Sequence, residues 1–237
     1  MTEPYSEDNL LDRLTPPETL AEAYEAEKAR ERHLIDTRLR VREGTALSVG
    51  SGWHPGRHLL PAERWRLVAV DVDPERPAYA VAEGRADAGF AGRAGALHDL
   101  EDGAYDLVLY RLVLHHVAYA EPLGPVFAEA ARLLRPGGAL VAIEPSVWHP
   151  VGAVLALANR LHLGVAVHGT PDDIPLSPRR LMAEARGAGL RPELHAVTYG
   201  WRRLPRRAGR LVERLDRHGS KAGARWLGHT FMLIAYR

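Results

Sequence analysis

The stretch Thr45–Gly56, TALSVGSGWHPG, and the stretch Arg66–Glu75, RLVAVDVDPE, decide the fold of this chain. In the first, a short apolar strand runs directly into Gly-Ser-Gly at residues 50–52; in the second, a more apolar strand ends on Asp71. Glycines permit a tight turn and a close approach of a ligand to the backbone, because they carry no Cβ. An acid at the end of the following strand is placed to accept hydrogen bonds from a ribose. The two stretches therefore predict the first half of a nucleotide-binding βαβ unit.

Length and composition narrow the class of protein. The 237 residues suffice for one α/β domain with an elaboration, and the 31 basic and 30 acidic residues nearly balance, so charge does not favour a nucleic-acid partner. The lack of cysteine excludes disulfides and a cysteine nucleophile, and the histidines show no ligand-like spacing with acids, so we expect no metal site. The sequence shows no signal-peptide pattern and no apolar stretch near the ~20 residues of a membrane span. We expect a cytoplasmic protein without a membrane partner.

Strand and helix patterns alternate along the chain. Strand patterns occupy residues 46–49, 67–72, about 88–93, 106–110, 139–144, 193–199 and 231–236. Helical patterns occupy residues 17–40, 123–134 and a segment that begins at the Ser177-Pro178 cap and ends near residue 187. This alternation predicts an α/β fold with a doubly wound sheet.

Two segments, at about residues 146–176 and 200–228, fit the alternation poorly, and we expect them to be lid insertions. We expect residues 1–40 to form an N-terminal helical cap and residues 41–237 to form the α/β domain that contains these insertions. The segment Trp201–Trp226 holds eight Arg and one Lys against two acids, and its apolar residues share one helical face. We interpret this segment as a lid helix with a solvated basic face; binding of a phosphate-rich partner or of nucleic acid is the alternative.

Two further stretches carry a resemblance to a known family. They are DGAYDLVLYRLVLHHV at residues 102–117 and FAEAARLLRPGGALVAIEPS at residues 127–146. Together with the glycine loop and the acid that ends the second strand, they resemble class I S-adenosylmethionine-dependent methyltransferases of the small-molecule, ubiquinone-biosynthesis-like type. The resemblance implies a mostly parallel seven-stranded Rossmann-like sheet whose last strand is antiparallel. It also implies that S-adenosylmethionine lies across the carboxyl ends of the first, second and fourth strands.

The resemblance carries over unevenly to the cofactor residues. Ser48 stands where the family usually has an acid that helps to hold the methionine end, and Trp53-His54-Pro55 replaces small residues after the second glycine. In our register Ala96 takes the place of the adenine-binding acid, and the backbone N–H of Leu97 is expected to contact adenine. The cofactor-binding residues that the resemblance implies are Gly50, Ser51, Gly52, Asp71, Val72, Ala96, Leu97, Tyr110 and Arg111.

Arg111 and Tyr110 end the fourth strand, where the family more often has small polar residues. An arginine there is able to hold the carboxylate of the cofactor or to bind an anionic substrate bidentately. An ion pair between Arg111 and a carboxylate at the edge of the sheet is an equally good interpretation.

The pair His115-His116 follows the fourth strand, at the edge where such sheets bind ligands. In related enzymes that use a histidine base, the matching residue is His116, and we name it as the first catalytic candidate and His115 as the second. A neutral imidazole suits removal of a proton from a hydroxyl or amine. The alternative is that this motif only packs.

Glu144 ends the fifth strand, and we interpret it as structural. Trp148 and His149 follow it on the substrate side, so we expect both residues to bind substrate.

These observations favour a methyltransferase of small-molecule biosynthesis that transfers a methyl group from S-adenosylmethionine to an O, N or C nucleophile. Two alternatives stay open. The first is an enzyme of this fold that uses the bound cofactor without methyl transfer, for example in a cyclisation. The second is a degenerate fold that serves as a binding protein, for which the departures at Ser48, His54 and Ala96 argue. The sequence does not indicate an oligomeric state.

Overall fold

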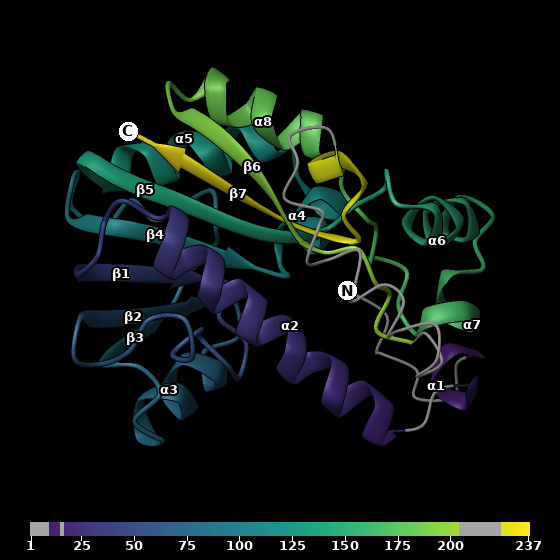
Figure 1. The fold of residues 1–237 in the computed structure, drawn as a ribbon. Helices are drawn as coiled ribbons and strands as arrows, with labels where there is room; N and C mark the ends of the chain where they lie inside the picture. The colour runs from purple at the N-terminus through teal and green to yellow at the C-terminus, as the bar shows by residue number, and fades with distance from the viewer. Residues whose placement is uncertain (1–9, 15–16, 204–223) are drawn as a thin grey trace.

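A seven-stranded sheet forms the centre of the molecule in the computed structural model, which describes residues 10–14, 17–203 and 224–237 (Figure 1). The strand order is β3-β2-β1-β4-β5-β7-β6. Strands β1 to β5 pair in parallel, and β7 runs antiparallel to both β5 and β6. The strands are β1 Gly44–Val49, β2 Trp65–Asp71, β3 Ala88–Ala91, β4 Tyr105–Arg111, β5 Leu134–Pro145, β6 Arg191–Thr198 and β7 Thr230–Tyr236. The predicted sheet and its antiparallel last strand are confirmed.

Helices cover both faces of this sheet (Figure 1). Helix α2 crosses one face, and α4, α5 and α8 lie on the other. The helices are α1 Leu10–Leu14, α2 Pro17–Arg38, α3 Glu75–Ala82, α4 Leu114–Ala120, α5 Leu123–Leu133, α6 Pro150–Arg160, α7 Gly164–His168 and α8 Pro178–Gly187, with a 3₁₀ helix at Ala224–Leu227. The three helical patterns read from the sequence therefore correspond to α2, α5 and α8.

Each face of the sheet has its own apolar core, because successive side chains of a strand point to opposite faces. Leu107 of β4 packs in the cluster that contains Ile35 of α2, whereas Val108 packs in the cluster that contains Phe127 of α5 and Leu181 of α8. Burying one such side chain contributes roughly 1.5–3 kcal/mol. Burial on both faces explains why the central strands are apolar throughout.

The order of the strands places a ligand-binding edge at the carboxyl ends of β1 and β4. The chain leaves β1 toward β2 and β3 on one side and returns to β4 on the other. At such a switch point the connections diverge and leave a crevice.

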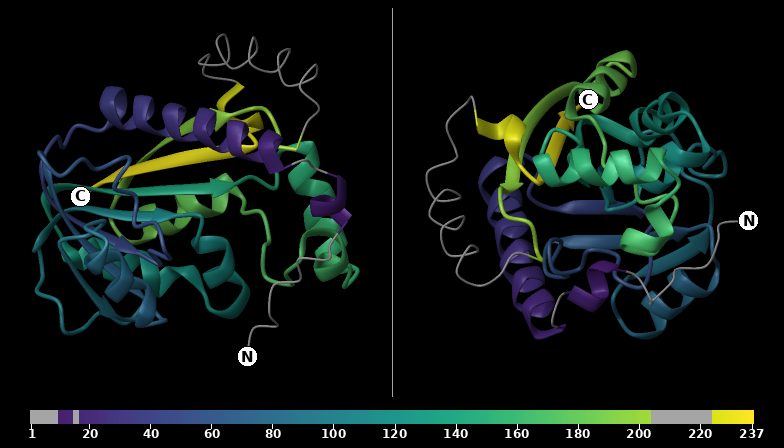
Figure 2. Two further views of the ribbon diagram at one scale, coloured as in Figure 1. Left: turned by 90° about the horizontal axis from the view of Figure 1, so that it is seen from below. Right: turned by 90° about the vertical axis from the view of Figure 1, so that its right-hand side faces the viewer.

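Helices α1, α6 and α7 lie beyond this edge (Figure 2), and α7 contacts both α1 and α6. They come from residues 1–40 and 146–176, the two segments that we expected to form a cap and a lid. The basic segment lies mostly at residues 204–223, outside the described residues. Among the helices that are described, none has the length and apolar character required to cross a membrane.

Candidate active site

A cleft of about 790 Å³ opens at the carboxyl ends of the parallel strands, and we call it the strand-end cleft. The turns after β1, β2 and β3, the start of α4 and the segment around Asp172 form its walls. The predicted cofactor residues that line it are Gly50, Ser51, Gly52, Asp71, Val72 and Arg111.

The glycine loop owes its shape to two left-handed residues. Gly50 has φ +64°, and a Cβ built there would lie 2.1 Å from Cγ2 of Val113. Gly52 has φ +52°, and a Cβ there would meet no atom within 4 Å. Residues other than glycine adopt this left-handed backbone conformation at a penalty of about 1–2 kcal/mol. Gly50 is therefore required by packing, whereas Gly52 faces open space.

Asp71 ties the second strand to this loop. Its Oδ2 accepts a hydrogen bond from the N–H of Gly52 at 2.8 Å, and its Oδ1 accepts one from the N–H of Asp73 at 3.1 Å. Only 3% of its surface is exposed, in contrast to 68% for the neighbouring Val72. The carboxylate thus holds the turn and still borders the cleft.

The predicted adenine position is wrong in register. Strand β3 ends at Ala91, and Gly92, Arg93 and Ala94 line the cleft in place of Ala96 and Leu97.

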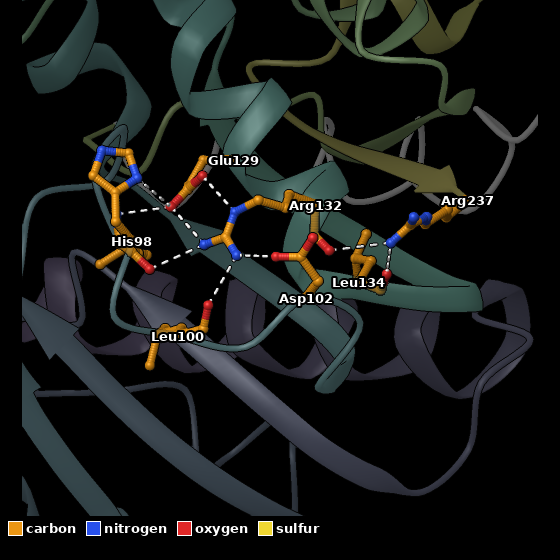
Figure 3. Close-up of polar contacts among 8 residues, drawn as sticks. His98, Leu100, Asp102, Glu129, Arg132, Leu134 and Arg237 are labelled. Carbon is orange, nitrogen blue, oxygen red and sulfur yellow. Dashed lines mark hydrogen bonds and ion pairs between the residues drawn. The ribbon is translucent and has the colours of Figure 1, made fainter.

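Leu97 is buried in the core, and its N–H donates to Oε1 of Glu129 at 2.8 Å. Arg132 holds the same carboxylate (Figure 3). Because this acid has already captured the N–H, Leu97 has no donor left for a ligand. On the cleft wall, Arg93 forms an ion pair with Glu121.

Tyr110 and Arg111 point to opposite faces, so the prediction that both bind the cofactor is corrected for Tyr110. Tyr110 is 1% exposed and lies in the core beneath α5, where burial raises the pKa of its hydroxyl. Arg111 reaches the cleft but pairs bidentately with Glu31 of α2, at 2.9 and 3.2 Å. His58 also lies 3.3 Å from Glu31. Of the two interpretations of Arg111, the structure contains the ion pair.

His115 is the centre of a buried network rather than a residue with a free ring nitrogen. Its Nδ1 lies 2.5 Å from Oε2 of Glu144, and its Nε2 lies 3.4 Å from Oδ1 of Asp173. Burial acts to lower the pKa of His115, but the adjacent Glu144 and the two aspartates raise it overall. Glu144 also accepts the N–H groups of Val113 and Leu114, which fixes the start of α4. Glu144 is therefore structural, as expected, and it holds His115 as well.

His116 contacts an acid through one of its two ring nitrogens, Nδ1. Its Nδ1 lies 3.1 Å from Oδ2 of Asp172, and 42% of its side chain is exposed. Burial, followed by the charge of His115, lowers the pKa of His116, while Asp172 partly opposes that change. Its imidazole is accordingly neutral near pH 7. With a proton on Nδ1 facing Asp172, Nε2 carries a lone pair that is able to accept a proton.

A second cavity of about 340 Å³, which we call the inner pocket, adjoins the strand-end cleft. The two cavities share Leu112 and His116 as lining residues. Leu112 has φ +54°, an unfavourable conformation for a side chain that is not glycine. The remaining walls of the inner pocket come from Leu11, Leu20, Tyr24, His115, Pro145, Leu155, His168, Asp173, Pro175, Trp201, Arg202, Arg203 and His229.

The predicted substrate residues Trp148 and His149 line neither cavity. Trp148 packs against Trp226 with 5.5 Å between ring centroids, and the guanidinium of Arg179 lies 4.5 Å from its ring. His149 caps α6 by accepting the N–H of Val151, and its ring meets His229 edge-on. Both side chains pack within the segment after β5, and binding of substrate by Trp148 and His149 stays a prediction.

Sequence reasoning missed Asp172, Asp173 and His168. They lie in the motif His168-Gly-Thr-Pro-Asp172-Asp173, which has no recognisable metal-ligand spacing. Asp173 lies against His115, and Asp172 lies against His116. The available signal in the sequence was a pair of adjacent acids and a pair of adjacent histidines.

Comparisons with known proteins agree with this architecture. Residues 47–142 match the family model of the methyltransferase domain. A SAM-dependent methyltransferase of Thermotoga maritima is similar in structure, with a TM-score of 0.64 at 16% identity over 92% of this chain and 93% of that one. Phosphoethanolamine N-methyltransferase 2 of Haemonchus contortus, solved with S-adenosylmethionine, gives 0.58 at 15% identity, over 87% of this chain and 52% of that one.

A methyltransferase partner from Haloferax volcanii, solved in complex with a methyltransferase activator, gives a TM-score of 0.63 at 18% identity over 98% of this chain and 99% of that one. A search of the curated proteins found no match. Identities of this size show the fold, and the family model adds the kind of domain and its cofactor. Residues 47–142 therefore form a methyltransferase domain, and the described chain has the fold of S-adenosylmethionine-dependent methyltransferases.

Proposed function

We propose that this enzyme transfers a methyl group to a hydroxyl or amine of a small acceptor held in the inner pocket. The observation that carries this proposal is the position of His116, which lines both cavities and has its Nδ1 against Asp172. A base for methyl transfer has to stand where the two reactants meet, and His116 stands there.

The strand-end cleft is the proposed cofactor site. The backbone of residues 50–52 and the carboxylate of Asp71 would hold the nucleoside end of S-adenosylmethionine. Thr170 lines the same cleft, and its Oγ1 is buried without a hydrogen-bond partner in the described part of the chain. A buried unpaired polar atom costs about 1–3 kcal/mol, so it favours a ligand that supplies the missing bond. The residues present therefore fit a polar nucleotide cofactor.

The bound cofactor would supply an electrophilic methyl group on its sulfonium. Its methyl–sulfur bond would break as the bond to the acceptor forms, and S-adenosylhomocysteine would be the second product. His116 Nε2 takes the proton that the hydroxyl or amine loses, and Asp172 stabilises the imidazolium that results. The walls of the inner pocket exclude water and orient the acceptor. We also propose that the described parts of residues 1–40 and 146–176 act as a cap and lid, because Leu20, Tyr24, Leu155 and Pro175 all line this pocket.

Two measurements test the proposal. Calorimetry with S-adenosylhomocysteine should show saturable binding, and Gly52→Val should abolish it by filling the open side of the loop. Incubation with S-adenosylmethionine and a set of small phenols and amines should give a product heavier by one methyl group, together with S-adenosylhomocysteine. A product of unchanged mass would favour the cyclisation alternative, and absence of binding at millimolar concentration would favour a binding protein.

A further inference from the structure

His168, at the end of α7, lines the inner pocket and carries a ring nitrogen that is buried and unpaired among the described residues. The residue is 7% exposed and lines that pocket. Its Nε2 lies 2.7 Å from Oδ1 of Asn159, and its Nδ1 is buried without a hydrogen-bond partner among the described residues. An atom of this kind indicates that a ligand completes the hydrogen bonding, because leaving it unpaired costs about 1–3 kcal/mol.

The neighbours of His168 fix its tautomer. The amide of Asn159 is oriented by its Nδ2, which donates to the carbonyl oxygen of Asp173 at 3.1 Å. Oδ1 of Asn159 therefore faces His168 as an acceptor, and Nε2 of His168 must carry the proton that it donates. Burial lowers the pKa of His168, which keeps the ring neutral. Its Nδ1 is consequently a bare lone pair that can only accept a hydrogen bond.

The same reasoning applied to His116 gives a second bare acceptor in the same pocket. Asp172 holds Nδ1 of His116, which leaves Nε2 with a lone pair. Arg202, a donor on this wall, is engaged by Glu27 and lies over the ring of Tyr24. The inner pocket thus offers two imidazole acceptors.

The rest of the inner pocket favours an apolar body for the ligand. Its apolar walls are Leu11, Leu20, Leu112, Pro145, Leu155, Pro175 and Trp201, and they stand beside the polar side chains of Tyr24, His115, Asp173, Arg202, Arg203 and His229. Its volume of about 340 Å³ lies at the small end of the range for ligand sites, which is about 300–1,000 Å³. A compact ring system fits this volume and these walls.

We infer that the methyl acceptor is a compact, mainly apolar molecule with two hydrogen-bond donors, one placed at His116 and methylated there, the other donated to Nδ1 of His168. This inference rests on the proposed function and adds the substrate class to it. The second donor would hold the acceptor in one orientation and so select the atom that receives the methyl group.

Four probes test the inference: phenol, catechol, resorcinol and hydroquinone, each titrated by NMR into protein saturated with S-adenosylhomocysteine. At least one dihydroxybenzene should bind about 3- to 10-fold more tightly than phenol, since a net hydrogen bond contributes about 0.5–1.5 kcal/mol. In His168→Leu that preference should disappear. Equal affinities for all four probes in the wild type, or a preference that persists in His168→Leu, would overturn the inference.

A matched variant and a spectroscopic readout separate this role from a structural one. Leu155→Ala changes an apolar wall of the same pocket, so it should weaken phenol and the dihydroxybenzenes alike. His168→Asn keeps an acceptor near the position of Nδ1 and should restore part of the preference. In wild-type protein labelled with ¹⁵N-histidine, the Nδ1 signal of His168 should move upfield when the preferred dihydroxybenzene binds. An unchanged Nδ1 signal contradicts the inference even if the variants fail to fold.

The proposed function and this inference fail in different ways. Wild-type protein that does not bind S-adenosylhomocysteine overturns both. Protein that binds it and methylates a phenol, but that shows no preference for a second hydroxyl, overturns this inference alone.

Discussion

The strand-end cleft and the inner pocket meet at Leu112 and His116 but are built from different materials. The cleft takes much of its wall from turns that follow parallel strands, where left-handed glycines and backbone N–H groups set the shape. The pocket takes its wall from side chains of α1, α2, α4, the segment after β5 and the residues between β6 and β7, including four histidines. A wall made of backbone tolerates few substitutions, whereas a wall made of side chains can change its ligand by exchanging them. The comparison predicts that the cleft fixes the cofactor and the pocket fixes the acceptor.

Gly50→Val should produce the largest effect, because it changes the backbone loop that forms a wall of the strand-end cleft. The new Cβ would lie 2.1 Å from Val113 at a φ of +64°, so the loop or the start of α4 has to move. We expect complete loss of S-adenosylhomocysteine binding by calorimetry and a lower melting temperature. Gly187→Ala is the control, since a Cβ there meets no atom within 4 Å. Normal affinity in Gly50→Val would show that the loop shape does not determine binding.

His116→Ala tests the junction of the two cavities. Loss of a general base lowers turnover by ~10²–10⁴-fold, with little change in cofactor affinity. Because the pKa of His116 is lowered, the wild-type rate should rise with pH through a midpoint below the ordinary value for histidine and then level off. The variant should lack this rise, and Asp172→Asn should show part of the loss. His98→Ala, at an exposed histidine outside both cavities, is the matched control. A folded His116→Ala enzyme with the wild-type rate would assign catalysis to positioning alone.

The pH dependence of stability should arise at the inner pocket. Burial, and then the neighbouring His149, lower the pKa of His229 to about 4. The unfolded chain therefore binds this proton more readily, so the stabilisation is present above about pH 6.5 and is lost as the pH falls toward 4. The change amounts to about 3 kcal/mol.

Urea unfolding at a series of pH values measures this effect. His229→Phe should remove most of it, and His54→Gln, at the more exposed histidine of the strand-end cleft, should remove much less. Parallel pH profiles for wild type and His229→Phe would contradict the assignment.

Asp71→Ala should give the smallest of these effects. Its carboxylate already holds the N–H groups of Gly52 and Asp73, and the hydrogen bonds that remain for a ribose are worth roughly 1.5–3 kcal/mol each. We expect the dissociation constant for S-adenosylhomocysteine to increase at least tenfold. Asp73→Ala, at a more exposed acid in the same turn, should change it less. An unchanged dissociation constant in Asp71→Ala would remove this residue from the site.

Local patterns sufficed for the sheet and, in β4, also for the direction of the side chains. The seven strand segments were predictable because apolar runs bounded by turn residues depend on neighbours in the sequence. The alternation in β4 also contained the direction of Tyr110, since Leu107 and Leu109 pack on one face and Val108 and Tyr110 on the other. The error at Ala96 has a different origin. The residues after β3 form an irregular turn, and its register depends on the capture of the Leu97 N–H by Glu129 from a distant helix.

The sequence by itself determined the strands, the glycine loop, Asp71 at the end of β2 and the position of His116 at the ligand-binding edge. Each of these follows from residues adjacent in the chain, because strand formation and turn conformation are local. Only the tertiary structure decided which groups meet there. Glu31 pairs with Arg111 across 80 residues, and Asp172 pairs with His116 across 56. Such pairs depend on where helices and insertions pack against the sheet, and packing is set by the summed burial of many side chains rather than by any local pattern.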